Sequence, residues 1–231
     1  MKLQFKEQEF QLHAVKAVVH SFEGQPLKTN KFTLERSQEI IRKTKLAAEG
    51  NQGLFESEVL EDIGYRNSPL VITDAQVLKN IQIVQSANDL NESQKIERAN
   101  VSSGGGKHGY NLTIEMETGT GKTYVYLRTI FELSEKYGFK KFIIVVPSVA
   151  IREGALKNIE MTSDHFKALY NNLEFEYFVY DSKKTNRIRQ FASSNQLQIM
   201  IINIDENISE DIKTELKTME GILDIRVINI D

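Results

Sequence analysis

Residues 116–123 read METGTGKT, and this short segment decides the fold class. Its end matches the phosphate-binding loop pattern G-x-x-x-x-G-K-[ST], while Met116 stands where the pattern has its first glycine. Gly119 and Gly121 carry no Cβ, so the backbone can turn its N–H groups inward at both positions. The segment therefore predicts a loop that holds phosphates.

The residues at the end of this loop suit a nucleotide bound together with Mg²⁺. Lys122 supplies a positive charge for the outer phosphates, and the hydroxyl of Thr123 is a candidate Mg²⁺ ligand. A helix that starts here would direct the positive end of its dipole at the anion. A glycine- and threonine-rich surface turn is the alternative interpretation, but the predicted order of strand, loop and helix favours a phosphate site. The candidate nucleotide-binding residues are Thr118, Gly119, Thr120, Gly121, Lys122 and Thr123.

Composition limits the classes of protein that this sequence could belong to. Of the 231 residues, 40% are hydrophobic and 26% charged, which is ordinary for a globular protein. Without a long apolar run, a secretory leader or any cysteine, the sequence predicts a cytoplasmic protein with no membrane partner. The net charge of −3 means that any contact with DNA would have to be local. The four histidines lack metal-ligand spacing.

A mostly helical segment is expected over residues 1–108, upstream of the loop. Apolar residues at helical spacing predict helices over 7–22, near 34–50 and over 73–88. Thr73 or Asp74 is the expected N-cap of the third helix. The stretch SSGGGKHG at 102–109 reads as a flexible connector.

Strands and helices alternate over residues 109–231, which predicts an α/β domain with a parallel sheet and flanking helices. The run KFIIVVP at 141–147 is continuously apolar, as is typical of a strand buried on both faces. Gly138 is positioned to end the helix that follows the phosphate loop. Strands are expected over 110–116, 141–147, 175–180, 198–204 and 222–230, and helices over 122–138, 163–173, 185–194 and 209–221.

Two longer stretches, IEMETGTGKTYVYLRTIFEL at 114–133 and KFIIVVPSVAIREG at 141–154, closely resemble the restriction (Res) subunits of type III restriction-modification systems. The Met-Glu-Thr-Gly start is typical of that family, so Met116 fits. FKEQEFQLHAVKAV, FVYDS and FASSNQLQIMIINID continue the likeness to about residue 205. The resemblance implies a RecA-like P-loop NTPase domain of helicase superfamily 2 over 109–231, incomplete or divergent after about 205.

The resemblance also implies roles for residues outside the loop. In the family an early glutamine reads adenine, because an amide both donates and accepts hydrogen bonds; by position this is Gln11, with Gln8 less favoured and a solvent-exposed helical glutamine as the alternative. The segment at 147–154 corresponds to a motif that touches the backbone of single-stranded DNA. Ser148 and Arg152 are therefore candidate DNA contacts, or else belong to a turn with an exposed arginine.

Members of this family use an Asp-Glu pair at a strand end, where the Asp holds the metal and the Glu activates water. The family form Asp-Glu-Pro-Gln does not occur in the sequence. Asp205 follows an apolar strand and is a candidate metal ligand, while Glu206 joins Lys122 as a candidate catalytic residue. In the family, however, this strand leads into a DNA-facing motif. A later strand ends at Asp231, without a following Glu.

The function implied by the resemblance is ATP hydrolysis coupled to motion on DNA. The enzyme then cleaves the DNA in partnership with a modification (Mod) methyltransferase subunit. A second RecA-like domain with the arginine finger and a nuclease domain would complete the enzyme, so the sequence predicts a truncated motor part. Two alternatives stay open. One is a non-catalytic nucleotide-binding or interaction fragment. The other is a P-loop nucleotide kinase, which would need a second phosphoryl-acceptor site that no segment marks.

Overall fold

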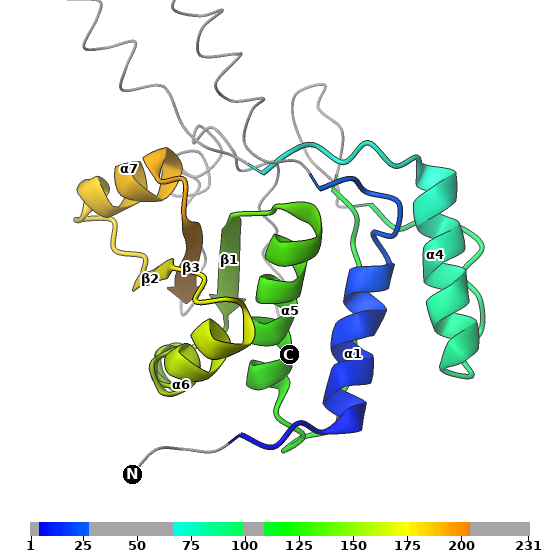
Figure 1. The fold of residues 1–231 in the computed structure, drawn as a ribbon, viewed down its shortest axis with the longest axis horizontal. Helices are drawn as coiled ribbons and strands as arrows, with labels where there is room; N and C mark the ends of the chain where they lie inside the picture. Colours follow the sequence, from blue (N-terminus) through cyan, green and yellow to red (C-terminus); the bar gives the residue numbers. More distant parts are fainter. Residues whose placement is uncertain (1–4, 28–66, 99–108, 204–231) are drawn as a thin grey trace, which may run out of the picture.

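The computed structural model describes residues 5–27, 67–98 and 109–203 (Figure 1). The helices predicted at 34–50 and 209–221 and the strand predicted at 222–230 lie outside the described residues, as does most of the predicted connector. The elements within the described ranges are α1 (Glu9–His20), α4 (Asp74–Ala87), α5 (Lys122–Tyr137), β1 (Lys141–Val146), α6 (Val149–Leu169), β2 (Phe175–Val179), α7 (Thr185–Ser193) and β3 (Leu197–Asn203).

The three strands form a parallel sheet in the order β1-β3-β2, which confirms the predicted α/β class. β3 is the central strand, and its residues from Leu197 to Ile202 are all buried. Because successive side chains of a strand point to opposite faces, β3 supplies apolar residues to both layers that cover the sheet. The apolar run of β3 therefore reflects burial on two sides.

Helices cover both faces of this sheet. On one face, Phe131 of α5 stacks on Phe166 of α6 with ring centroids 4.8 Å apart, and this pair packs with Leu197, Ile199 and Ile201. On the other face, α7 contributes Phe191, which packs with Met200 and Ile202. This three-layer arrangement fixes α5, the helix that follows the phosphate loop, against the sheet (Figure 1).

α1 packs along α5, and α4 lies outside α1 (Figure 1). Val15 and Val19 of α1 are buried in a cluster with Val125 and Leu133 of α5. The hydroxyl of Tyr137 also donates a hydrogen bond of 2.8 Å to the carbonyl oxygen of Val19. Since α1 and α5 share this core, the start of α1 is held beside the start of α5.

Several predicted helix ends are confirmed by the backbone. The side chain of Thr73 accepts a hydrogen bond from the N–H of Gln76 at 3.3 Å, so Thr73 is the N-cap of α4. Gly138 adopts φ of 76° directly after α5, as predicted for a residue that terminates a helix. No helix in the described ranges is both long and apolar enough to cross a bilayer.

The strand predicted over 110–116 is wrong. In this segment only Tyr110 makes an isolated bridge, with Arg98, and Leu112 and Ile114 are 38% and 44% exposed. A strand needs a neighbouring strand to which its backbone can hydrogen-bond. At the first residue of β1, the backbone groups on the outer edge are bound by Asn67 and not by residues 110–116. The side-chain amide of Asn67 donates to the carbonyl of Lys141 at 2.8 Å and accepts from its N–H at 2.9 Å.

The burial predicted for 141–147 is only partly correct. β1 pairs with β3 on one side and forms an edge of the described sheet, which leaves Val145 48% exposed. The strand with the continuous buried run, from Leu197 to Ile202, is β3. An apolar run therefore located a strand of the parallel sheet, but it could not tell an edge strand from a central one.

α6 is longer than the helix predicted over 163–173, because it begins at Val149. Ser148 caps it, accepting a hydrogen bond from the N–H of Ile151 at 3.3 Å. Gly154 lies within the helix at an exposed position, where a glycine costs only about 1 kcal/mol. The buried residues of α6 recur at helical spacing and carry the helix through this glycine: Ala155, Ile159, Thr162 and Phe166.

Candidate phosphate-binding site

The loop before α5 has the backbone geometry of a phosphate cradle. Gly119 and Gly121 both have φ of 83°, in the left-handed region that favours glycine. The hydroxyl of Thr120 donates to the carbonyl of Glu117 at 2.7 Å and closes the turn. Gly121 is the N-cap of α5 and has no side chain to accept from the first N–H groups of the helix, which leaves these groups to meet an anion.

Lys122 and Thr123 occupy the first turn of α5, as the motif predicts. Lys122 is exposed and Thr123 half-buried. Burial raises the pKa of the nearby Tyr126 hydroxyl, and a hydrogen bond with the Thr123 side chain opposes this shift. An ammonium group and a hydroxyl therefore lie together at the positive end of a helix. In Figure 1 this end of α5 lies on the side to which the carboxyl ends of β1 and β3 point, where open α/β sheets bind ligands.

Met116 has a packing role at the start of the loop. It lies against the core shared by α1 and α5 and helps to line an apolar cavity of about 370 Å³. A glycine at this position would lose that contact. Met116 therefore has a reason of its own to stand where the motif has its first glycine. Val18, Ile114, Met116, Lys122, Val125, Tyr126 and Thr129 line the cavity.

Gln11 lies on the phosphate loop, although the two are 109 residues apart in sequence. Its side-chain Nε2 donates to the carbonyl of Thr120 at 2.9 Å. A Cβ added to Gly121 would lie 2.5 Å from the same nitrogen, so the amide covers the last glycine of the loop. Gln8, the less favoured candidate, is exposed and makes no side-chain capping bond. The structure thus brings Gln11 to the loop.

Ser148 and Arg152 lie together in a second place, at the carboxyl ends of β1 and β3. Ser148 is the N-cap of α6. The side chain of Arg152 is only 23% exposed, and its guanidinium donates to Asn203 at 2.7 Å and to Glu153 at 2.8 Å. A phosphate that bound Arg152 would therefore have to displace the Glu153 carboxylate.

The predicted metal ligands are placed only in part. Thr123 lies in α5, whereas Asp205 and Glu206 lie outside the described residues. Within the described ranges, no three His, Cys, Asp or Glu side chains gather closely enough to hold a metal ion. Among the predicted metal ligands, Thr123 is thus the one that the described part of the chain places beside the loop.

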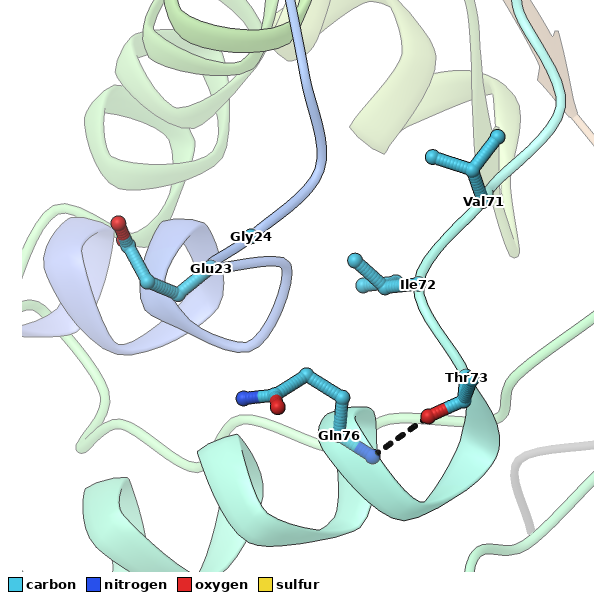
Figure 2. Close-up of a pocket in the computed structure, with 6 residues that line it drawn as sticks. All are labelled: Glu23, Gly24, Val71, Ile72, Thr73 and Gln76. Atoms are coloured by element: carbon cyan, nitrogen blue, oxygen red, sulfur yellow. Dashed lines mark hydrogen bonds between the residues drawn. The ribbon is translucent and has the colours of Figure 1, made fainter.

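A separate hollow of about 530 Å³ lies at the opposite end of α1 from Gln11, between Glu23 and the start of α4 (Figure 2). Its polar side chains are already engaged. Glu23 pairs with Lys136 at 2.6 Å, and Gln76 donates to Asn80 at 2.9 Å. This hollow is open and lacks the loop geometry of the first site, so it is not the candidate nucleotide site.

Sequence reasoning missed a cluster beside the phosphate loop. The hydroxyl of Tyr124 lies 3.0 Å from Nε2 of His165, and Nη1 of Arg128 donates to Glu7 at 2.8 Å. These residues come from α5, α6 and the segment before α1, so no local spacing could have revealed them. His165, one of the four histidines that lack metal-ligand spacing in the sequence, is half-buried in this cluster.

A comparison with protein families identifies one match along nearly the whole chain. The family model described as "Type III restriction enzyme, res subunit" matches residues 5–228. This match includes Gln11, the phosphate loop and the whole described sheet. It also extends past residue 205, where the motif resemblance ended.

Individual relatives have the same description. The chain is 41% identical over 112 residues to the Res subunit of the StyLTI type III restriction-modification enzyme from Salmonella typhimurium. It is 35% identical over 122 residues to the EcoPI Res subunit of Escherichia phage P1, and 33% over 120 residues to the EcoP15I Res subunit of Escherichia coli. These alignments cover 40%, 51% and 51% of this chain, but only 11% of each relative.

Proposed function

Because this chain belongs to the family of type III restriction enzyme Res subunits, we propose that it forms the N-terminal, ATP-binding motor part of such a subunit. The motor part would be a RecA-like domain. The parallel sheet supports this assignment, since helices cover both its faces and the phosphate loop lies on the side of its carboxyl ends. Superfamily 2 motors are ATP-dependent, so the expected ligand is ATP with Mg²⁺.

The observation that carries the proposal is the position of Gln11 on the loop. One N–H of its amide is used by Thr120, which leaves a second N–H and the carbonyl oxygen for a ligand. Adenine offers an acceptor at N7 and a donor at N6, which match these two groups. Guanine offers acceptors at both positions and matches only one. A base and its phosphates could therefore be held by adjoining parts of one site.

The residues around the loop also fit the phosphates and Mg²⁺. Lys122 would neutralise the outer phosphates, and the Thr123 hydroxyl is an oxygen donor of the kind that Mg²⁺ prefers. When bound, Mg²⁺ would offset the negative charge of the outer phosphates. In our proposal Asp205 would help to hold the metal, and Glu206 would activate the attacking water.

In the whole enzyme, ATP hydrolysis would drive motion along DNA and lead to cleavage together with a Mod methyltransferase subunit. Ser148 and Arg152 would contact the DNA backbone from the start of α6. Their position at the carboxyl ends of β1 and β3 supports this, because it places them on the same side of the sheet as the phosphate loop.

Calorimetric titration with ATP and Mg²⁺ tests the proposal. Lys122→Ala removes the main side-chain charge facing the phosphates, so we expect a loss of affinity well beyond about tenfold, or ~1.4 kcal/mol. Lys79→Ala is the matched control, since Lys79 is an exposed lysine on α4, away from the loop. Equal affinity of the Lys122→Ala variant and the unchanged protein would refute the phosphate-loop assignment.

A further inference from the structure

The segment Phe5–Gln8, which we term the N-terminal strap, lies against α5 and α6 just before α1 begins. The ring of Phe5 lies 4.7 Å from the ring of His165, and it stacks on the ring of Tyr124 at 6.3 Å. The carboxylate of Glu7 accepts a hydrogen bond of 2.8 Å from Arg128. An aromatic contact and an ion pair therefore both fix the strap.

Arg128 is the centre of this arrangement. Its side chain is only 11% exposed, and Nη1 donates to both the Glu7 carboxylate and the Tyr124 hydroxyl oxygen, the latter at 3.2 Å. A guanidinium this deeply buried requires a carboxylate partner, because an unpaired buried charge is costly. Glu132 is 3.9 Å from Nε, so Glu7 provides the closer carboxylate.

Polar contacts continue from Arg128 into α6. The hydroxyl oxygen of Tyr124 accepts from Arg128, and the same hydroxyl is hydrogen-bonded to Nε2 of His165, 3.0 Å away, where the tautomer of the imidazole decides which group donates. Burial, reinforced by the positive charge of Arg128, lowers the pKa of His165 and favours the neutral imidazole. The strap, α5 and α6 are thus joined through polar contacts as well as packing.

The first turn of α1 has few other attachments. Its N-cap residue Gln8 makes no side-chain capping bond, and Glu9 and Phe10 are exposed. The buried residues of α1, Val15 and Val19, lie at least one turn beyond Gln11. The core shared by α1 and α5 sets the position of the helix, and the bond of Gln11 to Thr120 and the preceding strap fix its first turn.

We propose that Arg128 is a specificity-determining positioning residue: by binding Glu7 it fixes the first turn of α1, holds Gln11 over the phosphate loop, and so sets the preference for adenine over guanine. The geometry carries this step, because Glu7 lies just before the N-cap of the helix that contains Gln11, while Arg128 belongs to the helix that starts at the loop. The inference rests on the proposed binding of ATP, but it concerns the base and not the phosphates.

The test compares the affinity of the full 231-residue chain for ATP, GTP and inorganic tripolyphosphate, each with Mg²⁺. In Glu7→Gln and in Arg128→Met, we expect the ratio of ATP to GTP affinity to fall about fivefold, the worth of roughly one hydrogen bond. Tripolyphosphate affinity should stay within about twofold, because it carries no base. The double variant should show little further fall in the ratio of ATP to GTP affinity beyond either single variant, since both substitutions break the same contact.

Glu132→Gln is the matched control, because Glu132 lies near Arg128 and accepts from Tyr170 at 2.8 Å but does not touch the strap. It should leave the ATP to GTP ratio unchanged. A second measurement needs no ligand: amide hydrogen exchange at residues 9–12 should speed up in Glu7→Gln and not in Glu132→Gln. Glu7 is 46% exposed, so this variant should fold even if Arg128→Met does not.

The outcomes separate this inference from the proposed function. If Gln11→Ala lowers the ratio while Glu7→Gln and Arg128→Met leave both the ratio and the exchange unchanged, the positioning role is wrong and nucleotide binding stands. If the unchanged chain binds neither ATP nor tripolyphosphate, the phosphate site itself fails and the inference falls with it.

Discussion

The sharpest test of how Gln11 and the phosphate loop depend on each other compares two single variants, Gly121→Ala and Gly119→Ala. Both glycines have φ of 83°, so an alanine at either position has the same unfavourable left-handed backbone, at about 1–2 kcal/mol. Their surroundings differ. A Cβ at 119 would meet no atom within 4 Å, whereas one at 121 would lie 2.5 Å from Nε2 of Gln11.

The difference between the two variants measures the Gln11 contact. The amide is the far end of a flexible side chain, so it can rotate away, but its bond to Thr120 is then lost. We expect Gly121→Ala to lower the free energy of unfolding by about 1 kcal/mol more than Gly119→Ala, the usual net worth of one hydrogen bond. Gly121→Ala should also weaken the preference for ATP over GTP, because the displaced amide no longer faces the base.

Urea denaturation followed by circular dichroism gives the free energies, and competition between ATP and GTP gives the preference. The same substitutions in a Gln11→Ala background form the control, because the clash is absent there. In that background Gly119→Ala and Gly121→Ala should lower the free energy of unfolding by equal amounts. If the two variants already have equal stability and equal base preference with Gln11 present, then Gln11 does not lie over the loop, and our account of base recognition is wrong.

Three further predictions concern catalysis and the core. The chain should bind ATP but hydrolyse it negligibly with or without DNA, because an arginine finger from a second domain supplies 10³–10⁵ in rate, roughly 4–7 kcal/mol; DNA-stimulated phosphate release that Asp205→Asn/Glu206→Gln abolishes would contradict this. Burial lowers the pKa of Lys141 to about 8 from 10.5, so the unfolded chain binds more protons between these values and stability rises with pH across that window. Lys141→Met should therefore raise the free energy of unfolding by ~1–2 kcal/mol at pH 7, and denaturation at several pH values should show this gain shrinking above pH 8. Tyr137→Phe should lower the free energy of unfolding by about 1 kcal/mol, since the hydrogen bond from the buried Tyr137 hydroxyl to the Val19 carbonyl is lost; an unchanged urea midpoint would show that the bond contributes nothing.

Much of the fold could be predicted because the relevant signals are local. The helical spacing of Val15 and Val19 located α1, and the side chain of Thr73 marked the start of α4. The apolar run of β3 gave a strand close to its observed bounds. Such patterns depend on the period of each element and on the chemistry of its ends, both of which a sequence displays directly.

The errors arose where the outcome depended on distant residues. The alternation of Leu112 and Ile114 suits a strand, yet Asn67 binds the adjoining edge of β1 at Lys141. Gly154 suggests a break, yet α6 continues through it because Ala155 and Ile159 are buried. Likewise the loop motif predicted the phosphate site, but the links between Gln11 and Thr120 and between Arg128 and Glu7 join segments more than a hundred residues apart.

The strand order has a consequence for the synthesis of this protein on the ribosome. β3 is the last of the described strands to be translated, yet β1 and β2 both pair with it and not with each other. Parallel pairing of segments so distant in the chain is slow, because a long loop must close before any hydrogen bond forms. Until residues 197–203 leave the exit tunnel, β1 and β2 lack the strand with which they pair in the described sheet. Their apolar side chains would then be exposed and prone to aggregation. The nascent chain should therefore depend on chaperones late in its elongation and lose that dependence once β3 inserts.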